Sequence, residues 1–246
     1  MQDNSALGRV MAVVRDLRNR CPWDRIQTRE TLRPYLVEEV LELDHAIGEG
    51  TADAIREELG DFLLHLSWQL VLAEEAGEFT ADELAQAVER KMQRRHPQLF
   101  DLGPPEPWER MKRRERGRGV LDGLPPSMPP LLMAFRLQER AASVGFDWPD
   151  TAGPLQKVRE ETDEVAAELG VARLPALTAE IGDLLFAVVN LARKAGVEPN
   201  GALQRANSKF AQRFAAVEAL AHERRMDVET AGLDALDRLW DEVKRR

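Results

Sequence analysis

Apolar residues recur along the chain at intervals of three and four, the spacing that places them on one face of an α-helix. β-Branched residues do not form alternating runs, and Ala, Leu, Glu and Arg, which favour helices, dominate the composition. Helices are predicted over residues 5–19, 29–48, 52–77 and 80–95, and then over 128–144, 152–170, 175–195, 199–223 and 228–245. The sequence therefore predicts an all-α protein.

Between the two series of helices lies a segment rich in proline, glycine and arginine. Its prolines, at 104, 105, 107, 125 and 126, exclude one long continuous helix there. We therefore predict an N-terminal domain over residues 1–102, a linker over 103–127 and a C-terminal domain over 128–246.

The two predicted domains are copies of one pattern. When the sequence is shifted by 122 positions, five acidic residues of the first half coincide with five of the second. The first set is Glu38, Glu39, Glu42, Glu58 and Asp61, and the second is Glu160, Glu161, Glu164, Glu180 and Asp183. Because glycines and apolar positions also coincide, the chain is predicted to be a tandem repeat of two helical bundles.

The predicted helix 175–195 is apolar around most of its circumference, so we expect it to be buried with its acidic stripe facing a cleft. Buried carboxylates need a compensating cation, and Mg²⁺ prefers oxygen ligands, with Mn²⁺ as a substitute. The predicted metal ligands and catalytic residues are Glu161, Glu164, Glu180 and Asp183. A solvated glutamate-rich helix face is the alternative. A di-iron site would need a second E-x-x-H pair, but the counterpart of His45 is Ala167.

Basic residues at helical spacing are candidates for holding phosphate. Lys209 and Arg213 lie four residues apart, as do Lys91 and Arg95 in the first half. Two asparagines of the second half, Asn190 and Asn207, correspond to Trp68 and Glu89 in the first. Because a neutral amide suits a phosphate ester better than an anion does, the C-terminal half is predicted to be the better nucleotide site. The second, weaker site would comprise Glu38, Glu39, Glu42, Glu58, Asp61, Lys91 and Arg95.

Charge and cysteine content narrow the function classes further. The net charge of −9 argues against a nucleic-acid surface, and the basic run at 112–116 is interpreted as a solvated face of the linker. The single cysteine, Cys21, fits a reducing cytoplasm. No secretory signal pattern begins the sequence, and no apolar run reaches the roughly 18 residues of a membrane span, so a cytoplasmic protein without membrane contact is expected.

Several segments together resemble the MazG family of nucleoside triphosphate pyrophosphohydrolases in its two-domain form. They are "CPWDRIQT", "PYLVEEVLEL", "EELGDFLLHL", "KMQRRHPQLF", "LPPSMPPLLMAFRLQERAASVGFDW", "EIGDLLFAVVNLAR" and "NSKFAQRF". The resemblance spans residues 8 to 245. Ala179 departs from it, since a second glutamate is frequent before Glu180, and this could remove one contact to nucleotide or metal.

The resemblance implies two MazG-like domains, Mg²⁺ dependence, a homodimer, and hydrolysis of nucleoside triphosphates to nucleoside monophosphate and pyrophosphate. It also implies that the C-terminal domain is the active one. By matching position, the nucleotide would be contacted by Lys157, Glu160, Lys209 and Arg213. Trp240 would stack on the base or serve as a core aromatic.

A mechanism follows as a hypothesis. A metal-bound water would attack in line, Glu161 would accept its proton, and Lys209 with Arg213 would stabilise the departing pyrophosphate. The role would be house-cleaning or regulation of the nucleotide pool. The alternatives are a catalytically silent nucleotide-binding regulator and a helical scaffold.

Overall fold

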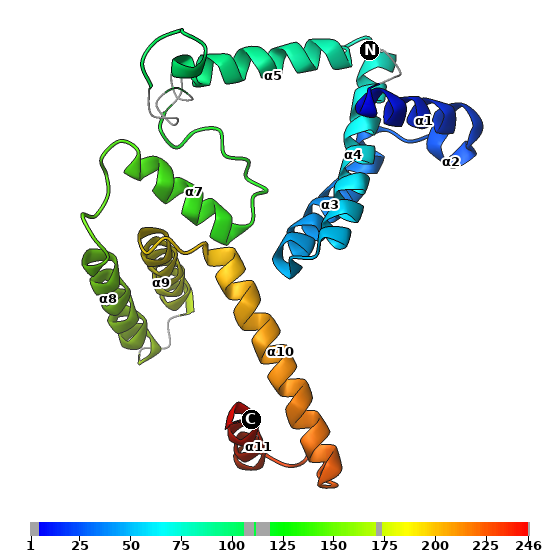
Figure 1. Cartoon of the computed structure of the whole chain (residues 1–246). Coiled ribbons are helices and arrows are strands. Elements are labelled where there is room, and N and C mark those ends of the chain that lie inside the picture. The colour runs from blue at the N-terminus through cyan, green and yellow to red at the C-terminus, as the bar shows by residue number, and fades with distance from the viewer. Residues whose placement is uncertain (1–4, 106–110, 112–118, 171–173, 246) are drawn as a thin grey trace. The chain divides into compact units, whose positions relative to one another are not determined.

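The computed structural model describes residues 5–105, 111, 119–170 and 174–245, and it divides the chain into two units, Met1–Trp108 and Glu109–Arg246 (Figure 1). Every regular element in the described residues is a helix, and the predicted all-α fold with two repeated halves is confirmed. The helices of the first unit are α1 (Ala6–Arg20), α2 (Pro22–Arg25), α3 (Arg29–Glu49), α4 (Ala52–Glu75), α5 (Ala81–Arg95) and the 3₁₀-helix η1 (Pro97–Leu99).

Local sequence sets the ends of these helices. Thr28 begins α3 with a capping box, in which its hydroxyl accepts from the Thr31 amide and the Thr31 hydroxyl accepts from the Thr28 amide. The same helix ends where Gly50 adopts a φ of 76°, a conformation that suits glycine. Thr80 and Glu83 form a second capping box at the start of α5. The α3–α4 connection is therefore short, which keeps the two helices adjacent.

In the first unit, α1 and α3 pack on α4. The packed side chains form one apolar core, which comprises Met11, Val14, Leu32, Trp68, Leu70, Val71 and Ala81. Two ion pairs tie α1 to the end of α4, Arg15 with Glu74 at 2.6 Å and Arg18 with Glu75 at 2.7 Å. Helix α1 thus lies tightly against α4.

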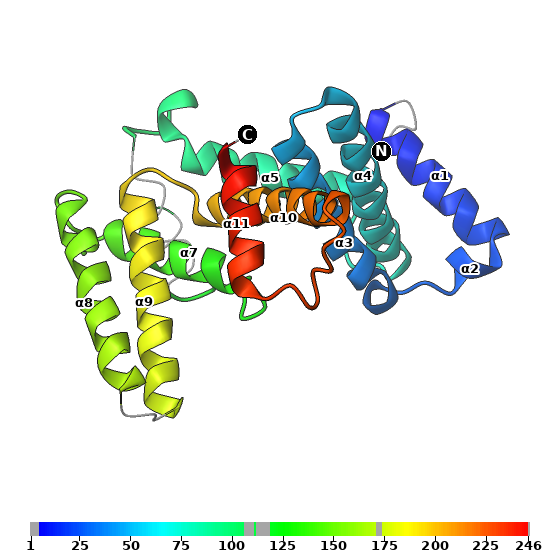
Figure 2. The ribbon, with the colours of Figure 1, turned by 90° about the horizontal axis from the view of Figure 1, so that it is seen from below.

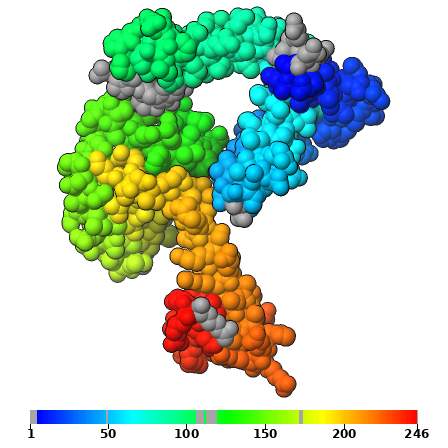
Figure 3. All heavy atoms as spheres, in the orientation of Figure 1, coloured from blue at the N-terminus to red at the C-terminus, as the bar shows by residue number. Residues whose placement is uncertain are grey.

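The second unit repeats this order. Its helices are α7 (Pro130–Ala142), α8 (Ala152–Leu169), α9 (Leu174–Lys194), α10 (Pro199–Glu223) and α11 (Leu233–Arg245). The α8–α9 pair corresponds to α3–α4, and α7 packs on α9 as α1 does on α4 (Figures 1 and 2). Helix α10 packs against α11 at the C-terminal end of the unit, around Val217, Leu220, Ala221 and Leu239 (Figure 3).

The helices agree with the predicted ones within a few residues at each end, with one larger difference. The last was predicted to begin at residue 228, but α11 begins at Leu233. The reason is a turn in which the Asp227 carboxylate accepts hydrogen bonds from the Glu229 amide and the Thr230 hydroxyl. Gly232 follows with a φ of 77°, so the chain cannot run on as one helix.

The segment predicted as a linker is not uniform. Part of it, residues 106–110 and 112–118, lies outside the described residues. Beyond it, the carbonyl oxygens of Leu121 and Asp122 accept hydrogen bonds from the Arg140 guanidinium at 3.2 and 2.7 Å. The buried Arg140 therefore ties the end of the segment to α7, and this part belongs to the second unit.

Candidate functional site

Three of the predicted acidic residues of the second half come together across the α8–α9 pair. Glu161 and Glu164 lie one turn apart on α8, and Glu180 faces them from α9. One carboxylate oxygen from each lies within 4.8 Å of the others. Because helical residues at i and i+3 share a face, both α8 carboxylates reach the same point on α9.

The first half holds the same arrangement. Glu39 and Glu42 of α3 meet Glu58 of α4, again with carboxylate oxygens within 4.8 Å of one another. These are the positions that the shift of 122 residues relates to Glu161, Glu164 and Glu180. The repeat seen in the sequence is thus a repeat of a three-carboxylate group in space.

The fourth predicted ligand of each half stands apart from this group. Asp61 is close enough to raise the pKa values of Glu39 and Glu58, but it does not join their three oxygens. Asp183 is exposed one turn after Glu180, and likewise does not join the group within 4.8 Å. The structure therefore brings together three of the four predicted ligands in the second half and three of the five predicted carboxylates in the first.

The carboxylates of the first half repel one another. Burial raises the pKa of Glu39, and the charges of Asp61, Glu42, Glu58 and Glu38 raise it further. Burial also raises the pKa of Glu58, with Glu42 and Asp61 adding to the effect. A bound cation would relieve this repulsion.

Lys157 makes the second half different. Its ammonium lies 2.6 Å from Glu161 and 2.7 Å from Glu160, so hydrogen bonds to both carboxylates raise the pKa of Lys157. The hydrogen bond from Lys157 lowers the pKa of Glu161, whereas the hydrogen bond with Glu161 raises that of Glu164. The counterpart of Lys157 in the first half is Tyr35, which cannot supply this charge.

The three-carboxylate group of the second half also has the donor atoms that a cation needs. Glu161 is buried, and its Oε2 has no hydrogen-bond partner in the described part of the chain. A buried, unpaired carboxylate oxygen is costly, and a hard divalent cation satisfies it while accepting further oxygen ligands from Glu164 and Glu180. The donor set is all oxygen, as Mg²⁺ and Mn²⁺ require.

Within the part of the chain that the structure describes, Lys209 and Arg213 form no ion pair with Glu161, Glu164 or Glu180. Lys209 and Arg213 lie midway along α10, which leads away from the α8–α9 pair toward α11 (Figures 1 and 2). Asn207 is exposed on the same helix, and Lys91 and Arg95 lie on α5. Their proposed contacts with phosphate stay predictions.

Trp240 lies on α11 and packs against α10. Its ring centroid is 5.3 Å from that of Phe210, and the Lys244 ammonium lies 5.7 Å from its ring. The ring thus has an aromatic partner within its own helix pair, and its stacking on the base stays a prediction.

One sequence prediction about α9 does not hold in the single chain. The helix was expected to be buried on nearly all sides, yet Ile181 is 43% exposed, Leu185 54% and Val188 45%. The reason is that α7, α8 and α10 cover one side of α9 and leave the other open. Among the described helices, α9 is the one long and apolar enough to cross a membrane by length and composition alone.

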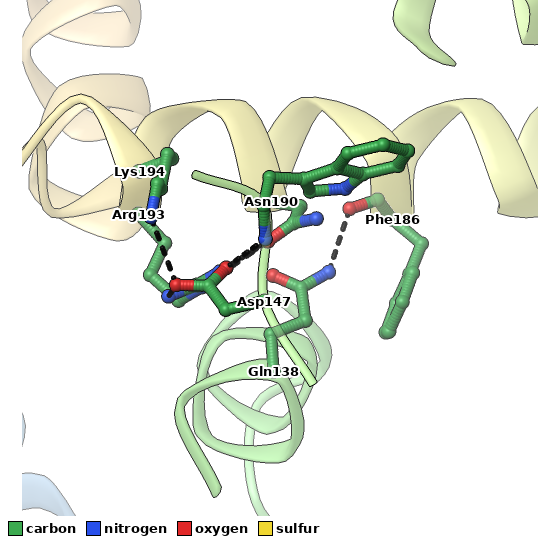
Figure 4. A network of polar contacts seen from close by, with 7 residues as sticks. Gln138, Asp147, Phe186, Asn190, Arg193 and Lys194 are labelled. Atoms are coloured by element: carbon green, nitrogen blue, oxygen red, sulfur yellow. Dashed lines mark hydrogen bonds and ion pairs between the residues drawn. The ribbon is translucent and has the colours of Figure 1, made fainter. Parts of the chain in front are cut away.

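Sequence reasoning missed a cavity of about 620 Å³ in the second unit, between α7, residues 145–148 and α9. Asn190, predicted to bind nucleotide, lines it together with Gln138 and Phe186 (Figure 4). Trp148 also lines it. Gln138 and Trp148 stand in the quoted segment "LQERAASVGFDW", but neither has the helical spacing to an acidic residue that drew attention to the carboxylates.

Comparison with known proteins agrees with the repeat. The pattern of the MazG nucleotide pyrophosphohydrolase domain matches residues 27–100 and 153–217. The chain is 40% identical to a nucleoside triphosphate pyrophosphohydrolase of Escherichia coli K12, over 96% of this chain and 95% of that protein.

Two further relatives are similar along most of the chain. The nucleoside triphosphate pyrophosphohydrolase/pyrophosphatase MazG of Thermotoga maritima is 40% identical over 91% of this chain and 89% of its own length. The uncharacterized protein YabN of Bacillus subtilis is 39% identical over 95% of this chain and 50% of its own length. Both carboxylate groups lie inside the matched domain segments.

Proposed function

Because the chain belongs to the MazG nucleotide pyrophosphohydrolase family, we propose that it hydrolyses nucleoside triphosphates to nucleoside monophosphate and pyrophosphate at the carboxylates of its C-terminal half. The observation that carries this assignment is the group Glu161, Glu164 and Glu180, in which a buried carboxylate oxygen has no partner. In the first half, the corresponding pair α3–α4 carries the second, weaker site.

We propose Mg²⁺ as the cofactor, with Mn²⁺ as a substitute. Glu161, Glu164 and Glu180 would hold it, with Asp183 one turn further along α9. When bound, the cation supplies charge neutralisation of the triphosphate and lowers the pKa of a coordinated water.

The chain's own residues would then position the substrate and move the proton. Lys157, already at the carboxylates, adds a positive charge beside the phosphates. Glu161, preferred from the sequence as the proton acceptor, keeps that proposed role. Its side chain is buried, and its Oε2 has no hydrogen-bond partner in the described residues, so this oxygen is open to a proton.

A homodimer is proposed to complete the site. In a single chain, α9 exposes Ile181, Leu185 and Val188, and α10 exposes a stacked pair, Phe210 and Phe214, at 6.0 Å between ring centroids. Contiguous exposed apolar side chains of this kind mark protein interfaces. Packing of a second copy against these faces would also bring basic side chains of α10 closer to carboxylates.

The proposed setting is the cytoplasm, with a house-cleaning or regulatory role in the nucleotide pool. The single cysteine suits a reducing compartment, and the net charge of −9 disfavours a nucleic-acid partner. A catalytically silent, nucleotide-binding regulator is the runner-up, since the carboxylates and the cavity serve binding as well as turnover.

The test is product analysis with the full chain. ATP, GTP, CTP and UTP are each incubated with Mg²⁺, and monophosphate, diphosphate, phosphate and pyrophosphate are resolved. We expect equal amounts of monophosphate and pyrophosphate, lost on chelation and restored by Mg²⁺ or Mn²⁺. Release of diphosphate and orthophosphate would instead identify a phosphatase.

Thermal shifts on the same samples separate the remaining alternatives. A regulator gives a Mg²⁺-dependent shift with nucleotide but no pyrophosphate, and a scaffold gives neither.

A further inference from the structure

A histidine of the first half lies beside the carboxylate group without a hydrogen bond of normal length. His65 of α4 is only 8% exposed, and its Nδ1 is buried with no hydrogen-bond partner in the described residues. Its Nε2 faces Glu39 of α3 at 3.6 Å from Oε1, beyond the range of about 2.7–3.2 Å for an N–H···O hydrogen bond. Because buried polar groups are nearly always paired, this imidazole is a ligand group that the chain's own side chains leave unsatisfied.

The spacing along α4 places this ring on the acidic face of the helix. Glu58, Asp61 and His65 stand at i, i+3 and i+7, which share one helical face. Burial lowers the pKa of His65, and the charge of Asp61 opposes this effect only in part. The ring is therefore neutral at pH 7, the form in which imidazole binds a metal ion.

The second half has a different residue at this position. When the sequence is shifted by 122 positions, His65 coincides with Ala187, which follows Glu180 and Asp183 on α9. Matching positions therefore offer oxygen alone in the second half, but oxygen and a ring nitrogen in the first. This difference bears on the choice of metal, because the type of donor atom selects among divalent cations.

The carboxylates of the first half also lack the compensation that Lys157 gives to those of the second. Within the described residues, the charges that shift the pKa values of Glu39 and Glu58 are all negative, and each raises the pKa. A cation bound at these carboxylates removes the repulsion and at the same time gives His65 Nε2 a partner.

The separation of His65 and Glu39 suits two ligands of one ion. Zn²⁺ holds nitrogen and oxygen ligands at about 2.1 Å in a tetrahedron, which places two ligand atoms about 3.4 Å apart. The 3.6 Å between Nε2 and Oε1 is close to this spacing. His65 does not join the three carboxylate oxygens within 4.8 Å, so it would bind from the side of Glu39. Glu42 and Glu58 have oxygens within 4.8 Å of Glu39 and reach the same ion by rotation of their flexible side chains.

We propose that the first half holds a divalent transition metal, such as Zn²⁺, with His65 Nε2 and Glu39 as its principal ligands and Glu42 and Glu58 completing its shell. Imidazole nitrogen suits Zn²⁺ and related ions, whereas Mg²⁺ takes oxygen ligands. The ion joins α3 to α4 and stabilises the first unit. This inference goes beyond the proposed function, because it assigns the first half a cation different from that of the second and involves no nucleotide.

The experiment measures metal binding by the full chain in the absence of nucleotide. Every sample carries Glu161→Gln and Glu164→Gln, which remove two of the three ligands of the second half. Calorimetric titrations with Zn²⁺ alone and with Mg²⁺ alone compare this chain with versions that also carry His65→Ala or His65→Gln. Circular dichroism checks folding, and glutamine serves as the test if the smaller alanine prevents it. His222→Ala, which removes an exposed histidine of α10, is the control.

We expect the starting chain and the control to bind one Zn²⁺, more tightly than Mg²⁺. Both His65 variants should bind Zn²⁺ about a hundredfold more weakly, because losing a group that merely orients a ligand already costs about tenfold to a hundredfold in affinity. Their affinity for Mg²⁺ should change little. Unchanged affinity for Zn²⁺ in both variants would overturn the site, as would the absence of Zn²⁺ binding by the starting chain. Equal losses for Zn²⁺ and Mg²⁺ would also count against it, since they would indicate general damage to the first unit.

Co²⁺ in place of Zn²⁺ separates ligation from a purely structural role of the ring. The visible absorption of Co²⁺ depends on its ligand atoms, so its bands should be altered in both His65 variants and kept in the control. His45→Ala tests the other nearby imidazole, since His45 lines an open pocket with Glu42 and Glu58. Bands lost in His45→Ala but kept in His65→Ala would move the ion to that pocket and overturn the assignment.

The result is independent of the test for hydrolysis. If the unmodified chain releases no pyrophosphate but Zn²⁺ binding depends on His65, the proposed function fails and the metal site stands. If pyrophosphate is released and the His65 variants bind Zn²⁺ as the starting chain does, the metal site fails and the proposed function stands.

Discussion

The two halves of the chain share a three-carboxylate group on a helix pair, but they differ at one junction, which is α1 with α4 in the first half and α7 with α9 in the second. In the first half, Trp68 is 3% exposed and fills this junction together with Met11 and Val14. The Arg18 guanidinium lies over its ring, 5.5 Å from the centroid. In the second half, the position of Trp68 is taken by Asn190, and the junction holds a cavity.

A few side chains therefore separate a packed core from a cavity in one architecture. Trp68 stabilises the first half by burying a large aromatic surface, whereas Asn190 gives up that surface and leaves polar groups open to a ligand. Lys157 against Tyr35 is a second difference, because it places a positive charge at the carboxylates of the second half alone. The comparison suggests one half suited to stability and one suited to chemistry.

The strongest test of this division removes equivalent carboxylates from each half. Glu164→Ala and Glu180→Ala should lower the rate of pyrophosphate release by about a thousandfold or more, because losing a cation ligand removes several kcal/mol of charge stabilisation. Glu42→Ala and Glu58→Ala, at the matching positions, should retain most of the rate. Circular dichroism checks that all four remain folded. If the N-terminal pair were the more damaging, the two halves would have been assigned in the wrong order.

Truncating the packed aromatic should affect stability instead of turnover. Trp68→Ala is expected to lower the free energy of unfolding of the first half by about 3–5 kcal/mol, the range for removing a buried aromatic side chain. Asn190→Ala removes a side chain that already borders a cavity, so it should lower the free energy of unfolding far less. Urea unfolding of the full chain, followed by circular dichroism, measures both. Equal losses would mean that the second junction is as tightly packed as the first.

Filling the cavity should remove the difference between the junctions. Asn190→Trp places the side chain of the first half in the second, and we expect kcat/KM for nucleotides to fall about tenfold to a hundredfold, because the change removes an asparagine predicted to bind nucleotide and fills the cavity that it lines. The reverse change, Trp68→Asn, should not create a second active half, because Tyr35 still stands where Lys157 would be needed. Steady-state kinetics decides the first point; full activity in Asn190→Trp would refute it.

The smallest expected effect concerns the ion pairs of Asp147 with Arg193 and Lys194. Its pKa is lowered to about 2, below the ordinary value of 3.8, so its contribution to stability is complete above pH 4 and is lost as the pH falls toward 2. Asp147→Asn should cost about 1 kcal/mol at neutral pH, a modest value for a partly exposed pair. Thermal unfolding between pH 2 and 7 measures this contribution. The variant should approach the unmodified chain at the acid end, and a constant difference across the range would contradict the ion-pair account.

How much of this could be read from the sequence depends on the kind of interaction. The helices follow from a local period and from local caps, such as Thr28 with Thr31, so their positions were predictable. The meeting of Glu161 and Glu180 was also predictable, because two adjacent helices with a short connection must pack along their matching faces. The pairing of Lys157 with Glu161 was not foreseen, although the two lie one turn apart on α8.

The cavity could not have been predicted in the same way. A cavity is space that side chains leave, and it depends on how Gln138, Trp148 and Phe186 from separate segments pack around Asn190. The sequence singled out Asn190 by its exchange with Trp68, but it gave no indication that Gln138 lies nearby with an unpaired oxygen. The open face of α9 was missed because hydrophobicity alone does not distinguish burial within one chain from burial by another.

The sequence by itself determined the all-α architecture, the duplication and the carboxylate positions, because each arises from spacing along the chain. The tertiary structure alone decided which junction is packed and which is open, and which amide atoms remain without a partner. Those properties depend on the volumes and hydrogen-bond geometry of side chains far apart in sequence, and they become definite only when the helices pack.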